Sequence, residues 1–395
     1  MPIVHMQDLL HHAYDNGYAV GAFDLVSLDF LEAIMAGAER AKAPVILSLA
    51  ESHFDYFDFE QIMSAVETAA KSAQVPVAIH LDHGTDFKSA VRAIGLGCNG
   101  VMVDSSNKPL GENIDATREI VNMARGCGVP VEGELGYVPG VEGEDALRHP
   151  GEIAYTTVED AKKYADQTGV DFLAVSIGTV HGRMQGEPEL DFERLEQINT
   201  ALKIPLVIHG GTGLSEGQYR QLIENGVAKI NYYTALSDAA ARQIAKNVEA
   251  GTMAGYTGLV ENVRDVIATE VERCIRLWGA QGRADELLAH CQPWRPVEHL
   301  IIFNVEQLDA EGAQAMIARG RSVLSAISGV RAVFTGQAVK QEAGYRYCWL
   351  VRFCHPLVID SYRDHPDHVA FADDYFRPVA GERISIDYLD LEGGV

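Results

Sequence analysis

The sequence has few basic residues, no paired-cysteine motif and no long apolar run. Its 395 residues include 32 Lys and Arg against 56 Asp and Glu, for a net charge of −24. Such a field repels polyanions, so we expect neither nucleic acid nor an anionic membrane as a partner. The 6 cysteines show no CxxC spacing, which favours reduced thiols in a cytoplasmic protein. No apolar run approaches the roughly 20 residues that span a bilayer, and the first residues do not resemble a signal peptide.

Residues 1–285 alternate between short apolar runs and segments with helical apolar spacing. The runs, read as buried parallel strands, are Val20–Phe23, Val45–Leu49, Val77–Asp82, Gly100–Val103, Val131–Leu135, Phe172–Ser176, Leu206–His209 and Ala228–Asn231. This order and length predict an α/β fold, a (β/α)8 TIM barrel. A doubly wound sheet is the alternative, but such sheets rarely need this many units.

A different pattern follows a linker predicted at residues 286–296. Residues 297–395 read as strand, helix, strand, strand, helix and strand, with the second helix broken at Pro366. This order is typical of a ferredoxin-like α+β domain. We therefore predict two domains joined by a short linker.

Three histidines, each followed by glycine, come at or just past an apolar run: His83 in VAIHLDHG, His181 in LAVSIGTVHG and His209 in PLVIHGGTGL. The carboxyl ends of barrel strands open on one face, so we expect the three imidazoles to converge there. Three neutral imidazoles can hold Zn²⁺ or a similar ion and leave a coordination position open. A single such histidine would more often belong to a satisfied strand end, but three together favour a metal site.

Carboxylates accompany these histidines. Asp82 precedes the first of them and suits either support of a metal ligand or general acid/base work. Glu132 and Glu134 share one face of a strand, because side chains alternate with period 2; they either bind metal and ligand or are interior charges satisfied by neighbours. Glu142 lies in a Gly-rich acidic segment that reads either as a lid over the barrel mouth or as an ordinary solvated loop.

The motifs HGGTG and NYYT follow the seventh and eighth runs, where barrels commonly build a phosphate site. Glycine allows backbone N–H groups to approach an anion closely, and the polar side chains add donors. A plain helix-start loop would also explain the glycines. The candidate phosphate ligands are Gly210, Gly211, Thr212, Asn231 and Thr234.

The first domain resembles class II, metal-dependent ketose-bisphosphate aldolases of the fructose/tagatose-bisphosphate type. The matching stretches include VPVAIHLDHG, GCNGVMVDSS, VEGELGYVPGVE, DFLAVSIGTVHG and IPLVIHGGTGL. The resemblance implies a catalytic Zn²⁺, with a second metal or monovalent cation as a possible addition, and a substrate that contains a dihydroxyacetone phosphate unit. It implies the following roles: His83, His181, His209 and Glu132 at the metal, Asp82 and Glu142 as acid/base groups, and Gly182, Gly211, Thr212, Asn231 and Thr234 at the phosphate.

The second domain resembles stress-responsive A/B-barrel (Dabb) domains. The stretches HLIIFNV, YRYCWLVRF and DSYRDHPDHVAF carry the resemblance. Such domains typically dimerise by pairing two sheets, so we expect a homo-oligomer, a dimer or tetramer. His365 and His368 are read as residues that cap a helix and shape the interface, with a ligand site as the alternative.

Several positions depart from the aldolase pattern and bear on the substrate. Asp24 replaces an asparagine, and Arg183 and Gln185 stand near the place of a usual lysine. Tyr232 and Tyr233 replace small or acidic residues after Asn231, and an Asp-Pro-Arg element is absent. Bulky aromatic side chains would reshape the pocket for the aldehyde half. We therefore predict that the aldehyde product is not glyceraldehyde 3-phosphate.

Two other functions fit the sequence less well. A metal-dependent hydrolase on the same barrel would be expected to carry an HxH motif in its first strand, which VGAFDLV lacks. A non-catalytic sugar-phosphate-binding protein with a Dabb interaction module is the second alternative. The presence of Asp82 and of all three histidines argues against a non-catalytic protein.

Overall fold

The computed structural model describes residues 2–145, 153–184, 186, 188–251 and 255–389. The chain divides into two compact units. The first comprises residues 1–90, 98–121 and 130–293, and the second comprises residues 91–97, 122–129 and 294–395. Among the helices that the structure describes, none is both long enough and apolar enough to cross a membrane.

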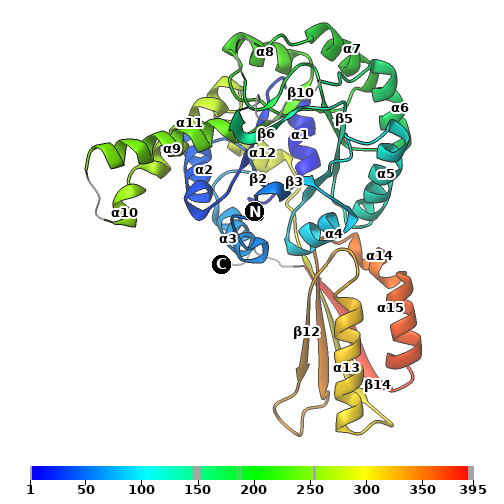
Figure 1. The fold of residues 1–395 in the computed structure, drawn as a ribbon. Coiled ribbons are helices and arrows are strands. Elements are labelled where there is room, and N and C mark those ends of the chain that lie inside the picture. Colours follow the sequence, from blue (N-terminus) through cyan, green and yellow to red (C-terminus); the bar gives the residue numbers. More distant parts are fainter. Residues whose placement is uncertain (1, 146–152, 185, 187, 252–254, 390–395) are drawn as a thin grey trace. The chain divides into compact units, whose positions relative to one another are not determined.

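The first unit contains a closed barrel of parallel strands in the order β1-β10-β9-β7-β5-β4-β3-β2 (Figure 1). The predicted TIM barrel is confirmed, and each predicted run forms one of its strands. The barrel strands are β1 (Val20–Asp24), β2 (Val45–Ala50), β3 (Val77–Gly84), β4 (Gly100–Val103), β5 (Val131–Leu135), β7 (Phe172–Val175), β9 (Leu206–Ile208) and β10 (Val227–Tyr232).

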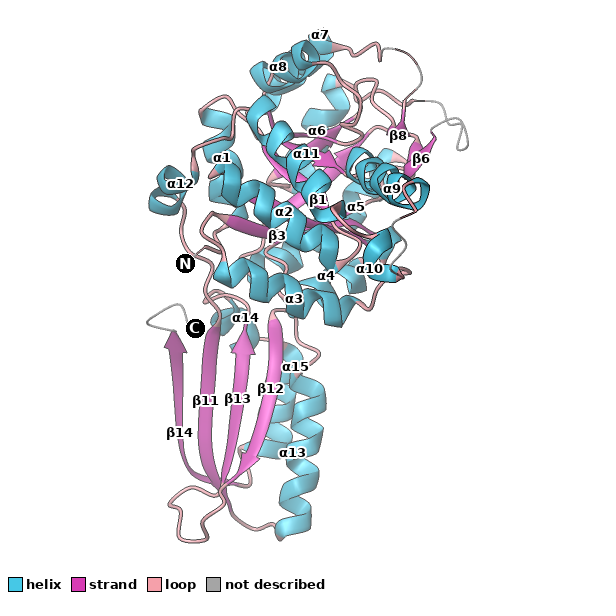
Figure 2. Cartoon of the chain, turned by 90° about the vertical axis from the view of Figure 1, so that its left-hand side faces the viewer, coloured by secondary structure: helices cyan, strands magenta, loops and turns pink. Residues whose placement is uncertain are grey.

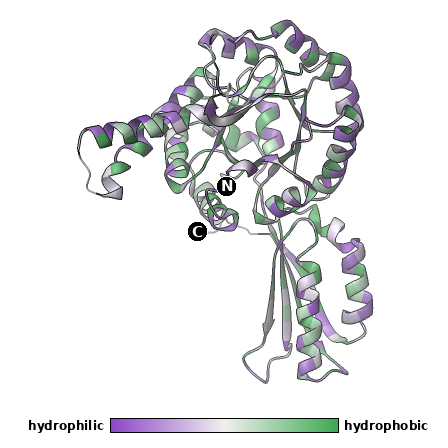
Figure 3. Ribbon diagram, in the orientation of Figure 1, coloured by the Kyte–Doolittle hydropathy of each residue, from purple (hydrophilic) through white to green (hydrophobic). Residues whose placement is uncertain are grey.

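Amphipathic helices surround the barrel, and both hydrophobic and hydrophilic residues alternate along them in Figure 3. In α3, for example, Phe59, Ile62 and Val66 are buried, and Asp58 caps the first turn by accepting from the Gln61 backbone at 2.9 Å. The helices are α1 (Met6–Asp15), α2 (Leu28–Ala41), α3 (Phe59–Ser72), α4 (Phe87–Leu96), α5 (Leu110–Gly126), α6 (Val158–Thr168), α7 (Phe192–Leu202), α8 (Glu216–Glu224), α9 (Thr234–Glu249), α10 (Tyr256–Leu259), α11 (Val263–Leu277) and α12 (Ala284–His290).

A small two-stranded sheet formed by β6 (Gly140–Asp145) and β8 (His181–Arg183) accompanies the barrel. Barrel strand β7 ends at Val175, so His181 belongs to this separate sheet rather than to a barrel strand. Its backbone N–H donates to the Pro139 carbonyl at 2.8 Å. The β6–β8 pairing, and not the end of a barrel strand, thus fixes the backbone of the second histidine.

The second unit has a four-stranded antiparallel sheet in the order β12-β13-β11-β14 (Figure 2). With its helices in the order strand, helix, strand, strand, helix, strand, it has the predicted ferredoxin-like plan. Helix α15 starts at Pro366, where the sequence predicted a break. The elements are β11 (Val297–Val305), α13 (Ala310–Leu324), β12 (Val330–Gln337), β13 (Tyr347–Phe353), α14 (Val358–Arg363), α15 (Pro366–Phe371), the π-helical turn η3 (Ala372–Phe376) and β14 (Ala380–Leu389).

Candidate active site

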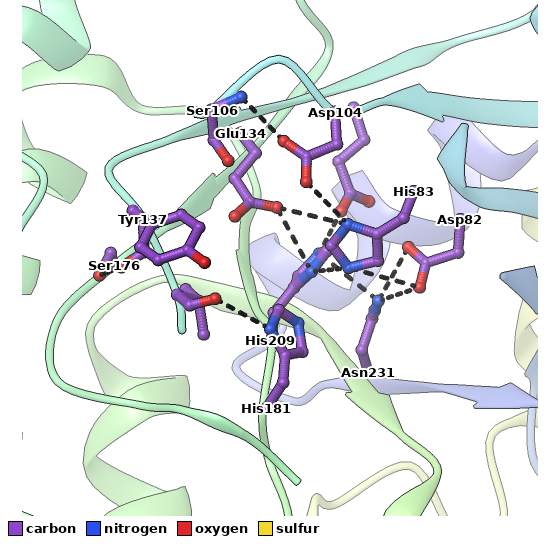
Figure 4. Close-up of polar contacts among 12 residues, drawn as sticks. Asp82, His83, Asp104, Ser106, Glu134, Tyr137, Ser176, His181, His209 and Asn231 are labelled. Atoms are coloured by element: carbon purple, nitrogen blue, oxygen red, sulfur yellow. Dashed lines mark hydrogen bonds and ion pairs between the residues drawn. The ribbon is translucent and has the colours of Figure 1, made fainter. Parts of the chain in front are cut away.

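The three predicted histidines lie together at the barrel mouth (Figure 4). The ring centroid of His83 lies 4.7 Å from that of His209 and 5.1 Å from that of His181. One ring nitrogen from each of the three lies within 4.8 Å of the others. The convergence predicted from three separate stretches of sequence is therefore present in the fold.

Each imidazole has one nitrogen held by an oxygen. His83 Nδ1 lies 3.1 Å from Asp104 Oδ2. His181 Nδ1 lies 3.1 Å from the Val138 carbonyl oxygen. His209 Nε2 lies 2.9 Å from Glu132 Oε1. Acceptors on the far nitrogen are the usual means by which proteins orient metal-binding histidines.

The other nitrogen of each ring faces the shared centre. His83 Nε2 and His209 Nδ1 are 2.9 Å apart, and buried His181 Nε2 has no hydrogen-bond partner among the described residues. Burial lowers the pKa of His181 to about 3, which keeps that imidazole neutral and its lone pair available. These three nitrogens form a donor set that fits a divalent cation such as Zn²⁺.

Glu134 is the carboxylate closest to the facing nitrogens. Its Oε2 lies 3.5 Å from His209 Nδ1 and has no hydrogen-bond partner in the part of the chain that the structure describes. Burial, together with nearby acidic groups, raises the pKa of Glu134 well above its ordinary value. A cation at the centre would stabilise the ionised form of this buried carboxyl, so Glu134 is a candidate fourth ligand.

Glu132, which the sequence placed at the metal, makes two other contacts. Besides His209 Nε2, it meets Lys229 Nζ at 2.7 Å. Burial alone would raise the pKa of Glu132, but the Lys229 ammonium and the bond to His209 lower it to about 2. Glu132 also forms a possible metal-binding group with Asp82 and His209. Its role as a direct ligand stays a prediction, and its contacts favour a supporting role.

Asp82 is fully buried at the end of β3, beside the three imidazoles. The Asn231 amide nitrogen donates to both of its oxygens at 3.0 Å. Burial opposes ionisation, but neighbouring positive charges, that of His83 foremost, hold the pKa of Asp82 below its usual range. An ionised, oriented carboxylate next to a candidate metal centre is the arrangement expected of a general base.

Sequence reasoning missed Lys229, which organises this cluster. Its side chain is fully buried, and its ammonium also donates to Asn231 Oδ1 at 2.7 Å. That bond turns the amide so that the nitrogen of Asn231 faces Asp82. A lysine inside the apolar run VAKIN was the available signal, because a fully buried lysine almost always has a charged partner.

In the glycine-containing turn after β9, the backbone lies close to the backbone before His181. Gly210 adopts φ +67°, and a Cβ there would lie 2.1 Å from the Val180 carbonyl oxygen. A Cβ on Gly211 would meet Ile230 at 2.8 Å. Thr212 follows in the turn, and buried Thr234 is the first residue of α9. Gly182 lies in β8 beside His181, so the candidate phosphate ligands come from neighbouring loops, and their role stays a prediction.

The two tyrosines after Asn231 have different positions. Tyr232 does not line the mouth: its ring lies 5.5 Å from that of Trp278, and its hydroxyl donates to Glu270 at 2.7 Å. Tyr233 lies 4.5 Å, ring to ring, from His53, which is 5 % exposed just after β2. Tyr232 therefore points away from the pocket for the aldehyde half, whereas a role of Tyr233 in shaping that pocket stays a prediction.

The remaining predicted positions vary in how far the structure describes them. Asp24 is fully buried at the end of β1. The Arg183 guanidinium pairs with Asp238, with Nε 2.9 Å from Oδ2. Glu142 falls in β6, but its side chain lies outside the described part of the structure, as does Gln185.

Comparison with protein families matches this architecture. The protein family described as "Fructose-bisphosphate aldolase class-II" matches residues 4–283. The chain belongs to the class-II fructose-bisphosphate aldolase family. As a class-II aldolase it is a carbon–carbon lyase, which favours that interpretation over a hydrolase. A second family, described as "Stress responsive A/B Barrel Domain", matches residues 297–390.

Individual relatives match much of the length of this class-II aldolase. The fructose-bisphosphate aldolase of Staphylococcus epidermidis is 38% identical over 291 residues, which are 72% of this chain and 100% of that protein. A probable fructose-bisphosphate aldolase of Bacillus subtilis is 39% identical over 253 residues, 63% of this chain and 88% of that protein.

Two solved structures show the same fold. The YdjI aldolase from Escherichia coli K12 has a TM-score of 0.64 and 30% identity, over 71% of this chain and 99% of that one. A putative fructose-1,6-bisphosphate aldolase from Coccidioides immitis has a TM-score of 0.65 and 28% identity, over 72% of this chain and 100% of that one.

Proposed function

We propose that this class-II aldolase uses Zn²⁺ to cleave a ketose phosphate reversibly into dihydroxyacetone phosphate and an aldehyde. One observation carries the proposal: three imidazoles face one centre, each with its second nitrogen held, beside the buried Asp82 carboxylate, whose two oxygens accept from the Asn231 amide. His83 Nε2, His181 Nε2 and His209 Nδ1 would hold the ion, with Glu134 as the nearest carboxylate. Imidazole and carboxylate donors without thiolates suit a catalytic zinc site.

The cleavage needs a base for the hydroxyl whose carbon becomes the aldehyde, and a place for negative charge on the ketone half. When bound, the divalent ion supplies Lewis-acid stabilisation of that charge. Asp82 takes the hydroxyl proton as the carbon–carbon bond breaks, and returns it in the condensation direction. Asn231 orients the Asp82 carboxylate, and Lys229 orients Asn231. Glu142, proposed from the family resemblance as a second acid/base group, would give a proton to the carbon of the ketone half that carried the broken bond, which completes dihydroxyacetone phosphate.

The phosphate of the dihydroxyacetone half is proposed to bind at the turn after β9 and at the start of α9. Backbone N–H groups and hydroxyls are available there from Gly210, Gly211, Thr212 and Thr234, and Gly182 in β8 is proposed to add its N–H group. Helices α8 and α9 begin directly after these loops, and helix N-termini favour anions. Asn231 is also proposed to contact the phosphate, and its amide nitrogen donates to Asp82.

We expect fructose 1,6-bisphosphate and tagatose 1,6-bisphosphate to be cleaved far more slowly than about 10 s⁻¹, a typical enzyme rate. Tyr233 and His53 occupy the strand-end region beside the catalytic cluster, and burial lowers the pKa of His53 to about 4, so it offers no positive charge for a second phosphate. Arg183 is already paired with Asp238.

The measurement is steady-state cleavage of both bisphosphates by zinc-loaded protein, alongside condensation of dihydroxyacetone phosphate with unphosphorylated aldehydes. We expect product only with the latter group. Turnover near 10 s⁻¹ with either bisphosphate would refute this specificity while leaving the aldolase chemistry intact.

We also propose that the chain is a homo-oligomer assembled through the second unit's sheet. Residues with even numbers on β11 and β14 lie on the face of the sheet opposite to His299 and Asp387, which line a cavity together with helical residues, and this open face carries many apolar side chains. Phe334 is 59% exposed, and Ile384 and Ile386 are each 41% exposed. Apolar surface of this kind commonly marks an interface between proteins. Its apolar residues are Leu300, Ile302, Phe334, Leu350, Ile384, Ile386 and Tyr388, and the Glu298–Arg352 ion pair lies on the same face.

Leu350→Glu in the full-length chain is therefore expected to lower the oligomer mass to that of a smaller assembly. The substitution places a charge in the centre of the open face, where pairing would bury it. Light scattering after gel filtration measures the mass. Val339→Glu, at a 99% exposed turn residue of the same unit, is the matched control and is expected to leave the mass unchanged. An unaltered mass for Leu350→Glu would contradict assembly through this face.

The expected cytoplasmic location and the expected absence of nucleic-acid and membrane partners stay predictions from charge and cysteine usage.

A further inference from the structure

The second unit contains a cavity of about 390 Å³ between its helices and its sheet. Its walls are largely aromatic: Trp349 and Phe353 from β13, Tyr362 from α14, Phe371 from α15 and Phe376 from η3. Cavities of roughly 300–1,000 Å³ with apolar walls and a few polar groups are typical small-molecule sites. The aromatic walls favour a planar, apolar ligand body.

A histidine–carboxylate pair lies at the polar side of this cavity. His299 Nδ1 is 2.7 Å from Asp387 Oδ1, across the β11–β14 ladder. The His299 ring stacks on Phe353, with centroids 5.7 Å apart, and is 16% exposed. Because Asp387 holds Nδ1 and the ring is packed, the other nitrogen, Nε2, has a fixed direction. Nε2 has no hydrogen-bond partner in the described part of the chain.

Three arginines also line the cavity, and they differ in whether they form ion pairs. Arg363 is paired with Asp360 and Asp364, and Arg377 is paired with Asp373. Arg383 has no ion pair with any residue that the structure describes. It lies on the same face of β14 as Ser385 and Asp387, because alternate residues of a strand share a face. The cavity therefore offers one uncommitted guanidinium, four residues along β14 from the carboxylate of the histidine pair.

We propose that this cavity binds a small aromatic carboxylate. Arg383 pairs with the carboxylate, for which its planar fork is suited. The ring lies among the aromatic walls, and His299 Nε2 hydrogen-bonds a polar substituent. All of these residues belong to the second unit, so the site is separate from the catalytic cluster of the barrel and does not depend on the proposed aldolase reaction.

Isothermal titration of the full-length chain with benzoate, salicylate and phenylacetate tests the proposal, with neutral benzyl alcohol as the comparison. At least one carboxylate is expected to bind with Kd below about 1 mM and at least about tenfold more tightly than the alcohol. Arg383→Gln is expected to weaken that binding by about tenfold or more. Lys340→Gln removes a positive charge from a turn outside the cavity lining and is expected to change nothing.

Ser385→Phe fills the cavity from an exposed strand position and is expected to abolish binding. Thermal melts of each variant show whether it is folded, and aldol cleavage measured in parallel is expected to stay unchanged. The proposal is overturned if no carboxylate binds, if the alcohol binds equally well, or if folded Arg383→Gln and Ser385→Phe chains bind as the unaltered chain does.

Discussion

His181→Ala is expected to weaken metal binding by more than about 100-fold, since even a change in the residues that support a metal ligand costs 10–100-fold. Aldol cleavage falls with the metal content. The reason is geometric: His181 Nε2 is buried and faces the centre shared with His83 and His209, and the ring's other nitrogen is held by the Val138 carbonyl. Elemental analysis of gel-filtered protein, followed by zinc titration against a competing chelator, measures the loss.

His365→Ala is the matched control, because it removes a partly exposed histidine from the second unit. That variant is expected to keep its full metal content and cleavage rate. If His181→Ala binds zinc as tightly as the unaltered chain, the three imidazoles do not form one site.

Asp82→Asn is expected to keep the metal and to lower kcat by about 10²–10⁴, the usual contribution of a positioned acid or base. Asparagine has the size of aspartate and can still accept from the Asn231 amide, so the fold and the donor set are preserved. It cannot take a proton at neutral pH. Steady-state kinetics with metal analysis on the same sample separates the two effects.

Asp86→Asn serves as the comparison, because Asp86 is an exposed carboxylate shortly after the same strand. Its kcat is expected to stay within about twofold of the unaltered value, because asparagine can still accept from the Ser89 backbone N–H, as Asp86 does at 2.8 Å, and caps a helix about as well. A full rate for Asp82→Asn would remove Asp82 from the chemistry. Loss of metal in that variant would instead make it a structural support of the centre.

The barrel was predictable because most of its strands are largely apolar runs between helical segments, the pattern that burial on both faces requires. His83 and His209 could be placed for the same reason, since strand ends meet at one mouth. His181 could not be placed this way. Its backbone position depends on pairing between β6 and β8, which are distant in sequence.

The sequence alone also could not show which of Glu132 and Glu134 lies nearer the candidate metal centre. Both share one face of β5, and only the three-dimensional neighbours separate them. Lys229, from β10, meets Glu132, while Glu134 Oε2 faces the imidazoles. Asp104 was missed although it follows β4, because no neighbouring motif marked it.

The prediction that Tyr232 reshapes the aldehyde pocket could have been corrected from the alternation of side chains along a strand. Asn231 points into the barrel, where it contacts Asp82 and Lys229. Its neighbour on the same strand must therefore point outward. Tyr232 accordingly packs against Trp278 and bonds Glu270 on α11, and Tyr233 alone lies beside His53.

Anomalous diffraction at the zinc absorption edge, from crystals of the zinc-loaded full-length chain, tests the central claim most directly. The expected result is a single strong peak about 2.0–2.1 Å from His83 Nε2, His181 Nε2 and His209 Nδ1, the usual zinc–imidazole distance. A fully loaded crystal with no peak among these three nitrogens, or with its only peak at other residues, would contradict the account.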